Sequence, residues 1–103
     1  MNDLIFVVDD NEMILEIVTA HLANVDFNNV QTFTNPLDAI EAMKDVSPAA
    51  IISDLQMPGM SGVELLSKNS EIPGIIMTGE DAAVEGLRAK GFTVLRKIDT
   101  YII

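Results

Sequence analysis

The stretch that decides the fold is Ala49-Ala50-Ile51-Ile52-Ser53-Asp54-Leu55-Gln56-Met57-Pro58-Gly59-Met60-Ser61-Gly62-Val63-Glu64. It begins with a short apolar run, 49–53, of the kind that forms a strand buried on both faces. A Pro-Gly loop follows, and Ser61 with Glu64 three residues later makes a capping box that opens a helix. The stretch is therefore a strand followed by a helix, with Asp54 at the end of the strand.

The same alternation of strand and helix runs along the whole chain. Apolar runs predict strands at 4–8, 30–33, 49–53, 74–77 and 92–96. Capping residues and helical spacing predict helices at about 11–25, 36–44, 61 onward and 81–90. Repeated strand–helix units form a parallel sheet with right-handed crossovers and helices on both faces. We therefore expect one domain over 1–103, an α/β doubly wound five-stranded parallel sheet whose fifth helix is missing.

Composition narrows the class of protein. The chain has 103 residues, 49% of them hydrophobic, which excludes disorder. The absence of cysteine excludes a disulfide and a cysteine nucleophile. A net charge of −10 argues against direct nucleic-acid binding, which needs a positive field. The longest apolar run, 4–8, is too short to span a membrane, and no leader is visible, so we expect a cytosolic domain.

The charges are unevenly distributed along the chain. Residues 1–43 contain no lysine or arginine, whereas Arg88, Lys90, Arg96 and Lys97 lie within ten positions. Two differently solvated surfaces or a basic docking patch would both explain this.

Polar residues follow four of the predicted strands, and the crevice of a doubly wound sheet lies at the carboxyl ends of its strands. They are Asp9, Asp10, Asp54, Thr78 and Lys97. Neighbouring carboxylates raise one another's pKa, and Mg²⁺ with oxygen ligands is the natural compensation. These groups suit phosphoryl transfer, with Asp54 as the nucleophile. A cation and Lys97 would neutralise the phosphoryl oxygens, and the Thr78 hydroxyl would donate a hydrogen bond.

Four pieces of the chain carry a resemblance to a known family. They are 7–11 (Val-Val-Asp-Asp-Asn), 52–62 (Ile-Ser-Asp-Leu-Gln-Met-Pro-Gly-Met-Ser-Gly), 75–79 (Ile-Ile-Met-Thr-Gly) and 95–97 (Leu-Arg-Lys). In order and spacing, the sequence resembles the receiver domains of two-component response regulators. The resemblance implies a flavodoxin-like sheet of order 2-1-3-4-5. It also implies that Asp54 accepts a phosphoryl group from a phosphohistidine on a histidine kinase or phosphotransfer protein.

The resemblance also implies roles for the residues around Asp54. Asp10, Asp54 and the Gln56 backbone carbonyl would bind Mg²⁺, and Asp9 would hold it mainly through water. Thr78 would move to bond the phosphoryl group, and Lys97 would pair with it.

Further family positions concern turnover and output. Gln56 and Glu80 match the positions that tune hydrolysis of the acyl phosphate, and Gly79 matches a small residue that leaves the site open. Self-phosphorylation and autodephosphorylation would be the only chemistry. Output would pass to a downstream protein through the fourth helix and fifth strand, in the bacterial cytoplasm.

The sequence departs from the family at three places. Ile98 follows Lys97 where the family has a proline behind a cis peptide, so this loop is strained or trans. Val94 stands where the family has a switch aromatic. Six residues follow Lys97, so the fifth helix is missing and an apolar sheet face is uncovered. A second copy, with residues 101–103, would cover that face in a homodimer; truncation of a longer chain is the alternative explanation.

Three functions remain open. The first is a phospho-accepting signalling switch. The second is a degenerate receiver that acts as a phosphorylation-independent interaction or dimerisation module, which Val94, Ile98 and the missing helix would suit. The third is a phosphohydrolase with an aspartyl-phosphate intermediate, which Gln56 disfavours because such enzymes carry a second aspartate at that position.

Overall fold

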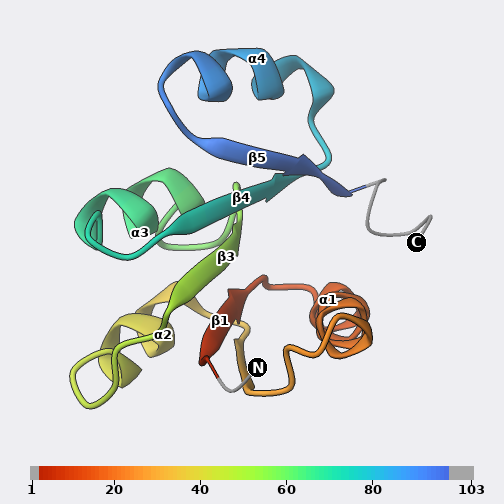
Figure 1. The fold of residues 1–103 in the computed structure, drawn as a ribbon. Coiled ribbons are helices and arrows are strands. Elements are labelled where there is room, and N and C mark those ends of the chain that lie inside the picture. Colours follow the sequence, from red (N-terminus) through yellow and green to blue (C-terminus); the bar gives the residue numbers. More distant parts are fainter. Residues whose placement is uncertain (1–2, 98–103) are drawn as a thin grey trace.

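The computed structural model describes residues 3–97. Strands and helices alternate along the chain (Figure 1). The strands are β1 (Ile5–Val8), β2 (Val30–Phe33), β3 (Ala50–Asp54), β4 (Gly74–Thr78) and β5 (Thr93–Arg96). The helices are α1 (Glu12–Asn24), α2 (Pro36–Ala42), α3 (Gly62–Lys68) and α4 (Asp81–Ala89). None of these helices is long and apolar enough to cross a membrane, among the residues described.

The five strands form one parallel sheet in the order β2-β1-β3-β4-β5. In the centre of the sheet Val8 of β1 is paired with Ser53 of β3, and Asp54 with Met77 of β4. The predicted α/β doubly wound sheet and its strand order are confirmed. Because all strands run in the same direction, their carboxyl ends meet at one edge.

The hydrophobic core lies in two layers, one on each face of the sheet. Helices α2, α3 and α4 pack on one face over Phe6, Ile51 and Ile76. Helix α1 packs on the other over Val7 and Ile52. Figure 1 shows α1 on the opposite side of the central strands from α2 and α3.

No second helix accompanies α1 on its face within residues 3–97. At the β4–β5 side of this face Leu95 is 41% exposed and Ile75 is half-buried, whereas Met77 is buried. The exposed apolar surface there is centred on Leu95. Residues 98–103, which include the Lys97–Ile98 peptide bond and the predicted dimer segment 101–103, lie outside the described part of the chain.

The helix starts follow from their capping residues. The side chains of Asn11 and Asn35 each accept a hydrogen bond from the backbone N–H two residues on, at 3.0 and 2.8 Å. Ser61 caps α3 as predicted, since its hydroxyl oxygen accepts from the Glu64 N–H at 3.1 Å, and the hydroxyl donates to Glu64 Oε1 at 3.4 Å. After α4 the chain turns at Gly91, whose φ of +96° favours glycine.

Some predicted boundaries were too long. Helix α2 ends at Ala42 instead of about Lys44, because a turn stabilised by backbone bonds from 43–46 replaces its last turn. Strand β5 begins at Thr93, because the N–H of Phe92 bonds back to Leu87 in the turn after α4.

Candidate functional site

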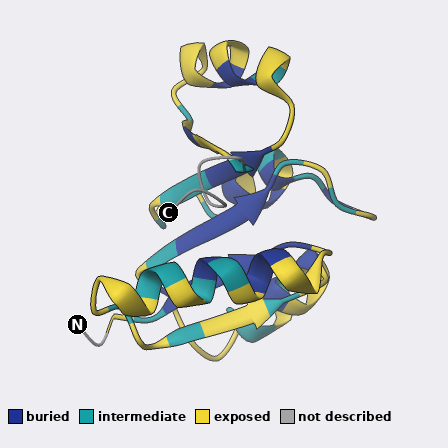
Figure 2. Ribbon diagram, turned by 90° about the vertical axis from the view of Figure 1, so that its right-hand side faces the viewer, coloured by how far each residue is buried: buried dark blue, intermediate teal, exposed yellow. Residues whose placement is uncertain are grey.

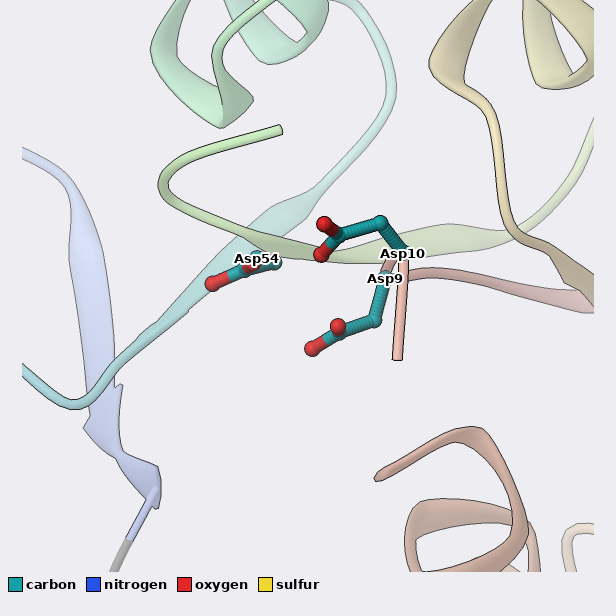
Figure 3. A group of neighbouring side chains, drawn as sticks. All are labelled: Asp9, Asp10 and Asp54. Atoms are coloured by element: carbon teal, nitrogen blue, oxygen red, sulfur yellow. The ribbon is translucent and has the colours of Figure 1, made fainter. Parts of the chain in front are cut away.

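The acidic site is built at the carboxyl ends of two neighbouring strands. Asp9 and Asp10 follow β1, and Asp54 is the last residue of β3. Their side chains point into a shared space at this edge of the sheet (Figure 3), and one carboxylate oxygen of each lies within 4.8 Å of the others. The strand–helix repeat therefore brings together the three carboxylates that the sequence analysis singled out.

Lys97 reaches the same space from the end of β5. Its ammonium group lies 3.0 Å from Asp9 Oδ2 and 3.0 Å from Asp54 Oδ1. The lysine side chain is 19% exposed, and the two carboxylates are almost fully buried. The lysine bridges the carboxylates of β1 and β3 across the end of β4.

Asp9 and Asp10 are adjacent in sequence and differ in environment. Asp9 is fully buried, and its Oδ1 accepts the N–H of Asn11 at 2.9 Å, so both of its oxygens have a partner. Asp10 is exposed. Asp10 therefore offers its carboxylate to a ligand from solvent more readily than Asp9 does.

Burial and neighbouring charges shift two pKa values in the site. Burial raises the pKa of Asp54, the hydrogen bond from Lys97 opposes that rise, and the charge of Asp9 adds to it. For Lys97, burial acts to lower the pKa, but its bonds to Asp9 and Asp54 outweigh burial and raise it. The charged form of Lys97 is therefore favoured by its two carboxylate partners, whereas burial and the neighbouring carboxylates disfavour the charged form of Asp54.

Thr78 lies at the end of β4, next to Asp54 in the sheet. It is 2% exposed, and its hydroxyl oxygen accepts the N–H of Glu80 at 2.9 Å. A hydroxyl that accepts one bond keeps its own proton for donation. Glu80 and Gln56 are exposed on the two loops that leave the sheet beside Asp54.

Residues 5–99 match the model of the response regulator receiver domain family. The chain belongs to this family. It is 34% identical over 101 residues to the DNA-binding transcriptional regulator NtrC of Escherichia coli, a match that covers 91% of this chain and 21% of NtrC. It is 30% identical over 100 residues to the transcriptional regulatory protein FixJ of Bradyrhizobium diazoefficiens, which covers 90% of this chain and 48% of FixJ. This receiver domain therefore spans about a fifth to about half of the length of these relatives.

A solved structure supports the fold of this receiver domain. The response regulator TrrA from Thermotoga maritima, in complex with Mg²⁺-BeF, superposes with a TM-score of 0.75 at 24% identity. The match covers 89% of this chain and 83% of that one.

The donor set of this receiver domain fits a hard divalent cation. One ammonium group faces three carboxylates, so Lys97 does not balance the negative charge of the cluster. Carboxylate oxygens are the ligands that Mg²⁺ prefers, and exposed Asp10 leaves one side of the cluster open to solvent.

The backbone support of Asp54 is a part of the site that the sequence analysis missed. The buried Ser53 hydroxyl donates to the Asp54 carbonyl oxygen at 2.9 Å. Gly62, at the start of α3, donates its N–H to Leu55 at 2.8 Å and approaches the Asp54 carbonyl so closely that a methyl group would overlap it. The sequence signal was the position of Gly62, directly after a helix cap and at the end of the 52–62 piece.

Proposed function

We propose that this receiver domain is a phospho-accepting switch of a two-component system, in which Asp54 takes a phosphoryl group from a phosphohistidine. The observation that carries the proposal is the placement of Asp54. Its carboxylate is buried at the carboxyl edge of the sheet, 3.0 Å from Lys97 and within 4.8 Å of the Asp9 and Asp10 oxygens. Receiver domains are phosphoacceptor switches, so the phosphohydrolase with an aspartyl-phosphate intermediate is not favoured.

Asp54 is the nucleophile in the proposed transfer. One of its carboxylate oxygens attacks the phosphorus, the P–N bond of the phosphohistidine breaks, and its electron pair remains on the imidazole nitrogen. Lys97, already 3.0 Å from Asp54, neutralises the phosphoryl oxygens as charge builds up on them. The ion pair with Asp9 holds the ammonium group in this position.

Asp10, Asp54 and the Gln56 backbone carbonyl would hold Mg²⁺ directly, with Asp9 acting through water. Full burial and the bonds to Asn11 and Lys97 suit Asp9 to this indirect role. When bound, the cation supplies positive charge that offsets the carboxylates and the incoming phosphoryl group.

Thr78 would report the phosphorylation to the loop before α4. Its hydroxyl proton would donate to the phosphoryl group, and any movement of the hydroxyl strains or breaks its bond from the Glu80 N–H. Glu80 precedes the first residue of α4, so the change would reach this helix directly. Gln56 and Glu80, both exposed beside the site, would set how fast water hydrolyses the aspartyl phosphate.

The proposed partners follow from this scheme. A histidine kinase or phosphotransfer protein would supply the phosphoryl group, and a downstream protein would read α4 and β5, in the bacterial cytoplasm. A homodimer through the sheet face that carries Leu95 and Ile75 is a further proposal. A solution mass equal to one chain at micromolar concentration would contradict the homodimer.

A phosphorylation-independent interaction module is not favoured, because Asp9, Asp10, Asp54 and Lys97 are all assembled. The deciding experiment is to incubate the protein with acetyl phosphate and Mg²⁺ and to weigh it intact. We expect a gain of one phosphoryl mass that EDTA or Asp54→Asn abolishes, and that Asp45→Asn, on an exposed turn, leaves unchanged. No gain in the folded protein, or a gain that survives Asp54→Asn, would overturn the proposal.

A further inference from the structure

A groove runs between α1 and β2, the strand at the opposite edge of the sheet from β5. Its volume is about 860 Å³. Its lining residues come from one flank of α1, from β2 and from the start of α2, and include Glu12, Thr19, Thr32 and Asp38. In Figure 2, α1 lies toward the viewer in the lower part of the molecule, directly beside the largely exposed strand β2.

The open edge of β2 faces this groove. Ile5 donates its N–H to Asn29 and Asp9 donates to Phe33, so the backbone groups of 29, 31 and 33 point toward β1. Backbone groups alternate in direction along a strand, so those of Val30, Thr32 and Thr34 point away from β1. These three residues all line the groove. An extended segment lying in it would meet a ready row of main-chain donors and acceptors.

The wall of the groove also suits an extended segment. From Glu12 to Ala23, α1 rises about 16 Å, the length of about five residues of extended chain. The Thr19 hydroxyl oxygen is buried in this wall and has no hydrogen-bond partner within residues 3–97. A buried hydroxyl without a partner is unfavourable, so rotation of the Thr19 side chain toward a peptide group in the groove would be favoured.

The negative charge of the groove favours a positively charged occupant. Three carboxylates line it, Glu12, Glu16 and Asp38, and the first 43 residues contain no lysine or arginine. Glu12 is the first residue of α1, and Asp38 lies in the first turn of α2. These two acids therefore lie at the end of the groove that is nearest the carboxyl edge of the sheet. A second copy, with a net charge of −10, is repelled from such a surface.

We propose that this groove, which we call the α1–β2 groove, binds an extended basic segment of a partner protein. The segment adds a strand to the free edge of β2 and places lysine or arginine against Glu12, Glu16 and Asp38. Small or β-branched side chains at alternate positions fit between α1 and β2. The proposal is independent of phosphorylation at Asp54.

The test selects heptapeptides from a random displayed library against the folded protein, and then compares Thr32→Pro with Thr32→Ala. Proline removes the N–H that points away from β1 and is tolerated on an edge strand, whereas alanine keeps the N–H. We expect selected peptides with lysine or arginine at one end and no central proline. Their binding should fall at least about tenfold in Thr32→Pro and stay within about twofold in Thr32→Ala.

A charge variant keeps the test decisive if Thr32→Pro does not fold. The triple variant Glu12→Gln, Glu16→Gln, Asp38→Asn should weaken the selected peptides by about tenfold and flatten the salt dependence of binding. Glu85→Gln, on the exposed surface of α4, should leave both unchanged. Labelling by acetyl phosphate should be unaffected in all of these variants, which separates this test from that of the proposed function.

Three results of the peptide experiments would overturn the proposal. They are the selection of no peptide above background, selection of peptides that bind the triple variant as tightly as the wild type, and amide shifts on peptide binding that lie outside residues 12–23 and 30–38. Self-association that blocks the groove in the protein alone would also overturn it, because the occupant would then be a second copy.

Discussion

The substitution Gly62→Ala tests whether the start of α3 is held against β3, the strand that ends at Asp54. Gly62 is buried at the first position of the helix. A β-carbon there would overlap the Asp54 carbonyl oxygen and lie only 3.1 Å from the Asp54 carbonyl carbon and 3.2 Å from Ser53 Oγ. Asp54 ends β3, a central strand, so its backbone cannot give way cheaply. The first turn of α3 must move instead.

Two effects of opposite sign set the magnitude. Overpacking a well-packed interior costs about 1–3 kcal/mol. Replacing glycine by alanine in a helix gains at most about 1 kcal/mol. We therefore expect the free energy of unfolding to fall by about 1–2 kcal/mol, a substantial part of the roughly 5–15 kcal/mol that stabilises a small domain.

Equilibrium unfolding in urea measures this change. With a slope of about 1–1.5 kcal/mol per molar, the midpoint of Gly62→Ala should fall by about 1 M. The matched control is Gly86→Ala in α4, where a β-carbon meets nothing within 4 Å. It should raise stability by about 0.5–1 kcal/mol through helix propensity alone. If both variants were stabilised to the same degree, the close approach of Gly62 to Asp54 would be refuted.

Three further predictions concern the acidic site and a helix cap. Lys97→Met leaves two buried carboxylates without their cation, so it should lower the free energy of unfolding in EDTA by about 1–3 kcal/mol and by less in Mg²⁺. Thermal melts that show the same loss of stability in both buffers would contradict this. Burial raises the pKa of Asp54, so its ionisation destabilises the fold increasingly as pH rises above the ordinary carboxyl value of 3.8. Asp54→Asn should therefore stabilise the metal-free protein at pH 7 and lose that gain as pH falls toward 3.8, and a gain independent of pH in urea titrations would argue against this. Asn35→Ala removes the side chain that accepts the N–H of Leu37 at 2.8 Å and should cost about 1 kcal/mol in the same titrations, so an unchanged midpoint would count against the cap.

Much of the fold was predictable because its signals are local. The apolar runs 4–8 and 49–53 predicted buried parallel strands, and Asn35-Pro36 and the capping box at Ser61 predicted helix starts. Boundaries were less predictable, as at Ala42 and Thr93, because backbone bonds in the neighbouring turns compete with the last residues of an element.

Part of the candidate site was also predictable, because one topological rule brings the ends of parallel strands together. From the sequence alone, that rule places Asp9, Asp10 and Asp54 at one edge of the sheet. In the structure, one carboxylate oxygen of each lies within 4.8 Å of the others. Their roles in phosphorylation and metal binding stay predictions that the labelling experiment tests. The order of burial was not predictable, since nothing in the sequence makes Asp9 buried and Asp10 exposed.

By itself, the sequence determined the alternation of strands and helices, the parallel sheet and the identity of the residues at its carboxyl edge, because hydrophobic period and capping act over a few neighbouring residues. Only the tertiary structure decided which groups meet across the sheet. The bridge from Lys97 to Asp9 and Asp54, the close approach of Gly62 to Asp54 and the groove between α1 and β2 join segments far apart in the chain. Such contacts depend on how the helices pack on the sheet, and close packing sets distances that no local pattern encodes.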